Sequence, residues 1–504
     1  MRWVLGLVGT GIDGPSISVN IMEFDRPDCL DDITSLGLTL AEGKQLLALV
    51  QQEIVAAQVG NHAVLRPACR TCNGRCHVKD WRLHRIATLF GEVRVRLPRF
   101  LCAGCGHTET GVSWPSHCRS TPALDELQAR LSALMTYRVA AEVLVHLLPV
   151  DAGKSPETLR SHTLQVGEQL GHAAVDRPAT VAAAITVSLD STFVRSREEG
   201  ARHLEVRVGN VETTAGGRQV FAAVAKADTD IAGLIQRDLE TMGQTDETEL
   251  TAFTDGCPSL RCILADAGVI KPPILDWFHI AMRMQHAAQA ASGLSTDGPD
   301  RVKAKAVIVA EVERLRWRIW NGKAKNAQRS IDRIRRVMHA FKGERGHRTK
   351  GVSSRRLWSA LHAADRYLRG QSAWLVNYAE RHRAGLRVGT SITEGTANFL
   401  VNRRMNKSQQ MRWSRRGADL LLKVRCAVNN GKLGSGPGHR FEAFANPNPM
   451  FARVAWSPQS LDSSITMTGI RSSSRFRARL NRVPMYFSNM ASVASDNRIS
   501  RLAA

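Results

Sequence analysis

The chain has 504 residues, of which 43% are hydrophobic and 23% charged, the composition of a globular protein with a few domains of ordinary size. No apolar run approaches the roughly 20 residues that a membrane helix needs, which excludes a membrane protein. The short, glycine-broken opening Met1–Ile12 does not predict a secretory signal, so we expect a cytoplasmic protein.

The formal net charge is +23, and the excess is concentrated in the second half of the chain. Residues 301–390 hold 23 basic and 6 acidic side chains, residues 403–504 hold 18 and 4, and residues 1–300 sum to −7. A basic half favours a polyanion partner, because Arg and Lys clusters attract phosphates. We expect this partner to be nucleic acid; the alternative is a solvated helical surface.

Periodicity and turn residues predict the first three segments. Residues 1–60 are expected to form an arm and an amphipathic helix over 34–58, and residues 61–120 a cysteine-rich module with a strand at Gly91–Pro98. Residues 121–175 predict helices at Pro122–Met135, Val139–Leu148 and Ser155–Leu170. The last of these is expected to expose Arg160, Ser161 and His162. This region resembles a helix-turn-helix, and an ordinary helical bundle is the alternative.

Beyond residue 181 the pattern changes to strands. They are expected at Ala182–Leu189, His203–Asn210, Gln219–Ala225, Glu249–Phe253 and Pro273–Asp276, with helices at Ile231–Met242 and Ser259–Ala267. This order predicts an α/β domain with a mixed sheet over residues 181–290. Residues 291–390 predict a basic helical insertion, and residues 391–445 a last helix, Thr396–Val428, with a break or bend at Gly417. The Ser- and Arg-rich tail, 446–504, is expected to be disordered.

Two C-x-x-C pairs lie in the cysteine-rich module. Cys69 and Cys72 form the first pair and Cys102 and Cys105 the second, with 29 residues between the pairs. Each pair places two thiolates on one tight turn, and two pairs complete a tetrahedral site, so we expect a structural Zn²⁺ bound by these four residues. Alternative ligands in the same module are Cys76, His77, His107 and Cys118.

Aspartates follow the predicted strands. Asp190 follows the strand ITVSL, and Asp255 follows TAF. Carboxylates at the ends of two buried strands can converge on Mg²⁺, a hard cation that prefers oxygen ligands. Glu394 comes after the basic insertion and is a candidate third carboxylate. From the spacing alone, the alternative to a metal site is that these aspartates simply occupy turns after the strands.

Five segments along the chain carry a further signal: SLD190ST, TD255G, LD276WFH279, E394GTAN and MRW413SRRG. In this order they resemble the DDE transposases of bacterial insertion sequences, most closely the ISKra family (number four in that series), and the resemblance implies a bacterial, nucleoid-associated protein. The phrases LGLTLAEGKQLLALVQQ and LLKVRCAVNNG also look like that family, and the resemblance covers residues 22–445. Asp276 and His279 also resemble the (C/D)-x-x-H signature of Mutator-like transposases, in which they would shape the site.

The resemblance implies a multidomain α+β protein with an RNase H-like catalytic core, interrupted by an all-helical insertion and preceded by a zinc-ribbon-like module and a DNA-binding helical region. It implies a catalytic triad of Asp190, Asp255 and Glu394 that holds two Mg²⁺ ions, with Mn²⁺ as a substitute, and accessory roles for Asp276, His279 and Trp413. The implied activity is cleavage and strand transfer of DNA by a homo-oligomer bound to the terminal inverted repeats and to target DNA. We expect DNA contacts from Arg160, Arg403, Arg404, Arg412, Arg415 and Arg416.

The segment after Glu394 reads GTANFLVNRRMN, where the family leads one to expect a more polar phrase. Three other functions stay open, of which a zinc-ribbon transcription regulator is the least favoured. The other two are a DNA-binding protein that derives from a transposase and has no activity, and an RNase H-like nuclease that cleaves without joining.

Overall fold

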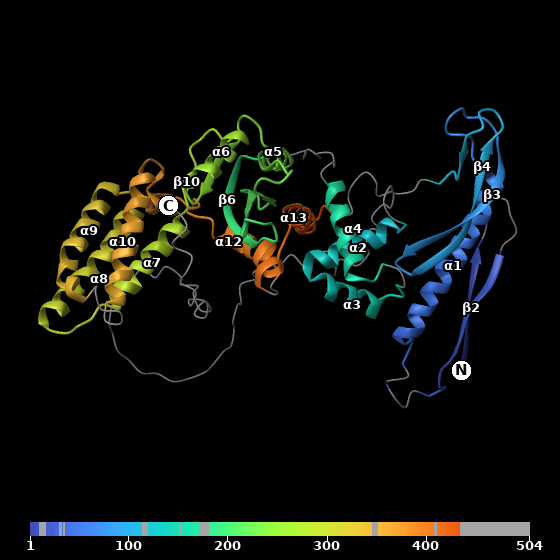
Figure 1. Ribbon diagram of the computed structural model, residues 1–504, viewed down its shortest axis with the longest axis horizontal. Coiled ribbons are helices and arrows are strands. Elements are labelled where there is room, and N and C mark those ends of the chain that lie inside the picture. The colour runs from blue at the N-terminus through green and yellow to red at the C-terminus, as the bar shows by residue number, and fades with distance from the viewer. Residues whose placement is uncertain are drawn as a thin grey trace, which may run out of the picture. The chain divides into compact units, whose positions relative to one another are not determined.

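The computed structural model describes residues 1–9, 17–29, 33, 36–112, 119–150, 153–170, 181–344, 351–407 and 411–433 (Figure 1). These residues belong to the first of the two units into which the chain divides, Met1–Phe444. The second unit, which contains the predicted tail, lies outside the described residues. None of the described helices combines the length and the hydropathy that a membrane span requires.

The N-terminal arm is a β-hairpin, which the sequence analysis missed. Strands β1 (Arg2–Gly9) and β2 (Ile17–Asp25) pair antiparallel. Helix α1 (Leu40–Leu65) follows and begins with a capping box in which Thr39 and Glu42 bond each other's backbone N–H groups. The helix is longer than the predicted 34–58 and is apolar on more than one side, since Leu40, Leu47 and Ile54 are exposed.

A long two-stranded ribbon follows α1. Its strands β3 (Cys76–Thr88) and β4 (Gly91–Cys102) pair antiparallel, with a bulge between Val78 and Asp80, and the short β5 (Thr108–Glu109) adds to β4. The apolar side chains of β4 that alternate along one face pack against α1; they are Val93, Val95 and Leu97, with Val55 and Val59 as their partners. The predicted strand Gly91–Pro98 is therefore confirmed, and the ribbon is the segment that separates the two C-x-x-C pairs.

Three helices follow as predicted: α2 (Pro122–Leu134), α3 (Tyr137–Leu147) and α4 (Pro156–Gln169). Thr136 and Ser155 cap α3 and α4 by accepting backbone N–H groups, and Pro156 occupies the first turn of α4. Helices α2 and α4 also pack on α13 (Arg415–Asn429), near the C-terminal end of the described chain, through Ala129, Val166 and Val424.

The central sheet has five strands in the order β10-β9-β6-β7-β8. Strands β6 (Ala184–Arg195), β7 (His203–Thr213) and β8 (Arg218–Val224) form an antiparallel meander, and β9 (Glu249–Thr254) and β10 (Ile274–Leu275) add parallel to the other edge of β6. All five predicted strands are thus present. Strand β6 continues five residues beyond Asp190, because only its parallel pairing with β9 ends there.

Helices cover both faces of this sheet (Figure 1). On one face α5 (Ile231–Thr241) and α6 (Pro258–Asp266) pack on Ile185, Val187 and Leu189 of β6. On the other face α12 (Ser391–Ala397), the π-helical η5 (Asn398–Lys407) and α13 pack on the alternate residues of β7 and β8. Because successive side chains of a strand point to opposite faces, the two faces of the sheet are buried in two separate cores.

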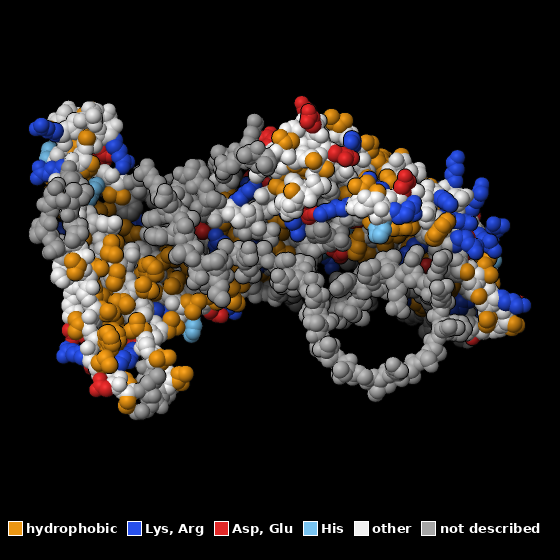
Figure 2. All heavy atoms as spheres, turned by 180° about the vertical axis from the view of Figure 1, so that it is seen from behind, with side chains coloured by type: hydrophobic (Ala, Val, Ile, Leu, Met, Phe, Trp, Pro, Cys, Tyr) orange, Lys and Arg blue, Asp and Glu red, His pale blue; other side chains and the backbone are white. Residues whose placement is uncertain are grey.

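The basic insertion is helical, as predicted. Its helices share one apolar core. They are α7 (Trp277–Ser292), α8 (Pro299–Trp320), α9 (Ala324–Val337), α10 (Val352–Gly370) and α11 (Tyr378–Arg383), with 3₁₀ turns at Met338–Glu344 and Ser372–Trp374. Their Lys and Arg side chains gather on the surface, at the right of Figure 2.

The predicted last helix, Thr396–Val428, is not continuous. It is divided into α12, η5 and α13, and α13 begins after Ser414, whose side chain accepts the N–H group of Gly417. The division lies before Gly417 rather than at it, because Ser414 supplies a new N-cap.

Candidate metal centre and carboxylate site

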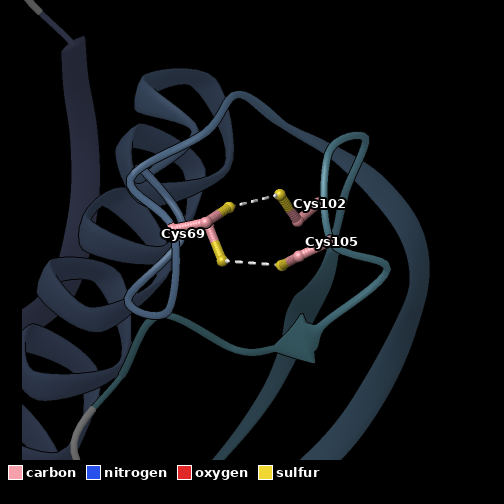
Figure 3. A group of neighbouring side chains, drawn as sticks. Cys69, Cys102 and Cys105 are labelled. Carbon is pink, nitrogen blue, oxygen red and sulfur yellow. Dashed lines mark hydrogen bonds between the residues drawn. The ribbon is translucent and has the colours of Figure 1, made fainter.

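The four predicted cysteines lie together. The Sγ atoms of Cys69, Cys72, Cys102 and Cys105 all lie within 4.8 Å of one another. Among the described residues, this is the one group of three or more His, Cys, Asp or Glu side chains whose ligand atoms lie so close together. The Cys72 and Cys102 Sγ atoms are 3.4 Å apart, and those of Cys69 and Cys105 are 3.6 Å apart. In Figure 3 Cys102 and Cys105 project across the gap toward Cys69. Four thiols in this arrangement can bind one tetrahedral metal ion.

The two cysteine turns have the same backbone geometry. In the first, the N–H of Asn73 donates to Cys69 O (2.8 Å) and Cys69 N–H to Gly74 O (3.0 Å). In the second, Gly106 N–H donates to Cys102 O (3.1 Å) and Cys102 N–H to His107 O (2.9 Å). Asn73 and Gly106, each directly after the second cysteine of its pair, have positive φ angles of 58° and 70°. This repeated turn aims both thiols of each pair at one point.

Backbone N–H groups prepare two of the thiols for a cation. Hydrogen bonds from the N–H groups of Cys105 and Gly104 lower the pKa of the Cys102 thiol to about 6. The N–H groups of Cys72 and Thr71 lower the pKa of Cys69 in the same way. Because the thiolate is the form that binds metal, the turns favour the ligating state.

The alternative ligands do not join this cluster. Cys76 faces Cys102 in the β3–β4 register, but its Sγ lies 3.9 Å from Gly74 O, where the thiol donates to a carbonyl oxygen. His77 and His107 are exposed and are not members of the cluster, and Cys118 lies outside the described residues.

The predicted aspartates lie at one level of the sheet. Leu189, Thr254 and Leu275 are register partners across β6, β9 and β10, so the next residues, Asp190, Asp255 and Asp276, follow one another across three parallel strands. Carboxyl ends of parallel strands point to the same edge, which is where α/β proteins place their sites. The structure thus brings these three residues together.

His279 completes the group from the first turn of α7. Its Nε2 lies 3.5 Å from a carboxylate oxygen of Asp190 and 3.9 Å from one of Asp276. The sequence pairs His279 with Asp276 only, and the contact with Asp190 is decided by the docking of α7 on the sheet.

Burial and like charge set the protonation of Asp190. Burial is the largest cause that raises the pKa of this carboxyl, to about 6, and the charges of Asp255 and Asp276 raise it further, whereas His279 and the N–H of Ser191 act in the opposite direction. The site therefore has an excess of negative charge that a divalent cation would relieve.

We expect Asp190→Asn to stabilise the metal-free protein. The pKa of Asp190 is higher in the folded state than in the unfolded state, so folding favours the protonated carboxyl. The wild type therefore keeps its full stability below about pH 4 and loses stability as the pH rises through about 6, where the buried carboxyl ionises. Without added Mg²⁺ at pH 7.5, the variant should therefore gain about 1–3 kcal/mol in unfolding free energy, and the gain should vanish near pH 4. Urea unfolding at both pH values measures this; an equal gain at both would contradict the assignment.

Glu394 does not join the aspartates as closely. It is exposed in α12, and Asp190, Asp255 and Glu394 do not form a group within the 4.8 Å criterion among the described residues. The helix that carries it is nevertheless anchored beside the site, because Thr390 bonds Asp276 and the Thr393 hydroxyl donates to Asn210 Oδ1 (2.6 Å). By strand alternation, Asp190 points toward the face of the sheet on which α12 packs.

Asp276 is a structural anchor. It is 1% exposed, and its Oδ1 accepts the N–H groups of Phe278 (2.8 Å) and Thr390 (2.9 Å), while Oδ2 accepts the Thr390 hydroxyl. It caps α7 and holds the N-terminal end of α12. These contacts connect α7 to the segment that leads into α12.

We expect Asp276→Ala to lower the unfolding free energy by about 2–4 kcal/mol, because a cap is lost and buried donors are left without an acceptor. Asp276→Asn retains an oxygen for both N–H groups and should cost less than about 1 kcal/mol. Urea unfolding of both variants tests the anchor role, and equal losses would argue against it.

The loop after Asp255 is held by residues that sequence analysis did not find. The Tyr367 hydroxyl donates to Asp255 O (2.9 Å), and Arg261 and Gln371 both donate to Gly256 O. Gly256 has a φ of 94°, which allows the tight turn. Tyr367 and Gln371 belong to the helical insertion, more than 100 residues away in sequence. No local pattern could indicate that the insertion supports this loop.

The six predicted DNA-contacting arginines differ in exposure. The prediction for Arg404 is wrong, because it is 3% exposed, donates to Ser132 O (3.0 Å) and lies over the rings of Tyr137 and Trp413. Arg415 is half-buried, with Glu198 (2.9 Å) as its ion-pair partner. The remaining four are exposed or partly exposed; they are Arg160, which pairs with Glu157, Arg403, Arg412, and Arg416, which pairs with Glu168.

Trp413 and His162 serve packing. Trp413 is buried, its Nε1 donates to Met405 O (3.2 Å), and its backbone N–H donates to Arg195 O (2.9 Å), so it joins the start of α13 to the end of β6. His162 is not exposed on α4 as expected, since its Nδ1 contacts Gln128 Oε1 (2.6 Å) and Asp125 Oδ1 (2.8 Å) of α2. Of the three residues expected to face DNA on α4, Ser161 is exposed and Arg160 partly so.

Comparison with protein-family models and with curated proteins finds no match to this chain.

Proposed function

We propose that the chain is a DDE-type DNA transposase with an RNase H-like core. The observation that carries this proposal is the position of Asp190 and Asp255. Asp190 lies in the first strand of the central sheet, directly after its parallel pairing with the fourth strand ends, and Asp255 directly follows that fourth strand. Three antiparallel strands followed by two parallel ones is the topology expected of that core. The helical insertion between Asp255 and Glu394 also agrees with the family resemblance.

The side chains at this edge fit a divalent metal site. Asp190 and Asp255 offer carboxylate oxygens. Burial raises the pKa of Asp190 most, and the neighbouring charges of Asp255 and Asp276 add to this, so a bound cation would favour the ionised carboxylates. Mg²⁺ bound there would supply Lewis acidity for in-line displacement at a phosphate. Cysteine thiolates, by contrast, suit Zn²⁺, which we assign to the structural site of Cys69, Cys72, Cys102 and Cys105.

His279 and Asp276 position the proposed ligands. His279 contacts Asp190 and orients its carboxylate, while Asp276 connects α7 to the segment that leads to Glu394. Glu394 is the third proposed ligand, and it would have to approach the aspartates when DNA and metal bind. The anchors at Thr390 and Thr393 hold its helix on the correct face of the sheet.

The remaining parts of the proposal concern DNA. The exposed cations of the helical insertion suit nonspecific phosphate contact with the target, and the N-terminal half would recognise the inverted repeats at the ends of the element. We propose a homo-oligomer on DNA, since two element ends have to be processed together.

Cleavage and joining assays with the full chain test this function. The probe is a duplex whose end carries the candidate terminal repeat, taken from the DNA that flanks the coding region. Mg²⁺-dependent nicking at the repeat boundary, followed by joining to a second duplex, is the expected result. Cleavage without joining would favour a nuclease, binding without cleavage a transposase-derived DNA-binding protein, and the absence of both would refute the proposal.

A further inference from the structure

The β3–β4 ribbon has one covered face and one bare face. Val93, Val95 and Leu97 alternate on the face that packs on α1. The residues between them, Arg94 and Arg96, point the other way and are exposed. We call this second side the outer face of the ribbon. It consists of Arg94 and Arg96 of β4 and of their neighbours on β3.

The neighbours on β3 follow from the register. Arg85 lies opposite Arg94, Leu83 opposite Arg96, and Trp81 opposite Pro98. Directly opposite residues of an antiparallel pair point to the same side, so Trp81, Leu83 and Arg85 share the outer face with Arg94 and Arg96. All five are exposed: Leu83 at 59%, Trp81 at 43% and the Arg94 side chain at 64%.

The charges on this face are unusual for a ribbon that only connects two cysteine pairs. Like charges directly opposite each other, as in Arg85 and Arg94, destabilise a β-sheet. Glu92, 3.2 Å from Arg94, is one nearby acid, and Asp80 is already engaged by Arg99. The surplus of positive charge is therefore a cost to the free protein that a bound polyanion would remove.

We propose that the outer face of the β3–β4 ribbon binds double-stranded DNA, with Arg85, Arg94 and Arg96 as phosphate contacts. A two-stranded ribbon is one of the elements that the major groove admits, and the four-residue step from Trp81 to Arg85 spans about 13 Å, close to the ~12 Å groove width. Guanidinium groups bind phosphate oxygens in pairs, which suits arginine at all three positions.

The cysteine cluster gives this face its rigidity. Cys76, the first residue of β3, and Cys102, the last of β4, are register partners, so the metal site lies at the open end of the ribbon. Closing that end by a metal ion holds the two strands in one register and leaves the outer face preorganised. This inference deepens the proposed function, since it names a surface through which the chain would contact DNA.

Salt-dependent binding of the full chain to a random-sequence duplex tests the proposal. Arg85→Gln/Arg94→Gln/Arg96→Gln should lower affinity roughly 10- to 100-fold near 0.1 M salt and reduce the log–log salt slope by about 2–3, one unit for each lost phosphate contact. The matched control removes three exposed cations elsewhere, Arg197→Gln/Arg202→Gln/Lys271→Gln, and should leave the slope nearly unchanged. Zinc content and circular dichroism establish that both variants are folded.

A gain of charge provides the reverse test. Leu83→Lys places a fourth cation in the centre of the face and should steepen the slope by about one unit, whereas Ile270→Lys, at a 94% exposed position, should not. Equal slopes for the ribbon variants and their controls would overturn the ribbon assignment while leaving DNA binding, and the proposed function, intact. Wild-type protein that binds no duplex, or that binds polyglutamate in its place, would overturn both.

Discussion

Replacing the paired aspartates should abolish DNA cleavage while leaving DNA binding nearly intact. Asp190→Asn and Asp255→Asn keep the size of the side chain and the hydrogen bonds that it accepts from Ser191 N–H and Cys257 N–H. Each change removes a negative oxygen from the proposed metal site. We expect Mg²⁺-dependent cleavage and joining to fall by at least about 10³-fold, since the metal supplies both the nucleophile and leaving-group stabilisation. Glu394→Gln should have the same effect from α12.

The decisive comparison uses one end-bearing duplex for both cleavage and gel-shift assays. Binding should tighten slightly in the Asn variants, because a negative charge near phosphates is removed. Asp276→Asn is the control, since it changes a carboxylate at the same level of the sheet that is already occupied by Phe278 and Thr390. A variant of Asp190 or Asp255 that cleaved like the wild type, or lost cleavage only through lost DNA binding, would remove the basis for a two-metal site.

Removing one cysteine of the cluster should release the metal and unfold the module around it. We expect the wild-type chain to contain about one zinc, and Cys69→Ser or Cys102→Ser to retain less than about a tenth of it, because a structural site of this kind needs all four thiolates. The open end of the β3–β4 ribbon then loses its closure. DNA affinity should fall with the zinc content, and a strong chelator should reproduce the effect on the wild type.

Cys76→Ser is the matched control for this experiment. Cys76 lies in the same segment and faces Cys102, yet its thiol contacts the Gly74 carbonyl. Zinc content and thermal unfolding should be close to those of the wild type. Loss of zinc from Cys76→Ser to the same extent as from Cys102→Ser, or a wild-type chain without zinc, would refute the assignment of the four ligands.

The cysteine centre and the sheet were predictable because their determinants are local. A C-x-x-C turn places its two thiols by backbone geometry within a few residues, so its spacing suffices to predict one half of a site. The strand segments of the sheet either alternate apolar and polar residues or are wholly apolar. Asp190 and Asp255 directly follow such apolar segments, and the parallel pairing of β6 with β9 then places the two aspartates side by side. Ser155 and Pro156 likewise predicted the start of α4 from a local cap.

The N-terminal hairpin was missed for a physical reason. Strand β1 reads RWVLGLVG, which is apolar without a clear period of two, and most of it is exposed, so hydrophobic patterning gives no signal for either face. The segment GTGIDGPS, rich in turn-forming Gly, Asp, Pro and Ser, is the feature of the sequence that indicates a turn here. In the same way, a run of apolar letters in α1 indicated a helix but not which side packs on the ribbon.

The sequence by itself determined most of the helices and strands, the two cysteine pairs and the positions of Asp190 and Asp255 after apolar strand segments, because these depend on neighbours within a turn or a strand. Only the tertiary structure decided which charged residues are available. Arg403 and Arg404 are adjacent letters, yet one is exposed and the other is buried against Ser132 of a distant helix. Tyr367 supports the Asp255 loop from 112 residues away. Such contacts arise from the docking of whole helices, whose burial of apolar surface determines which polar side chains face the interior.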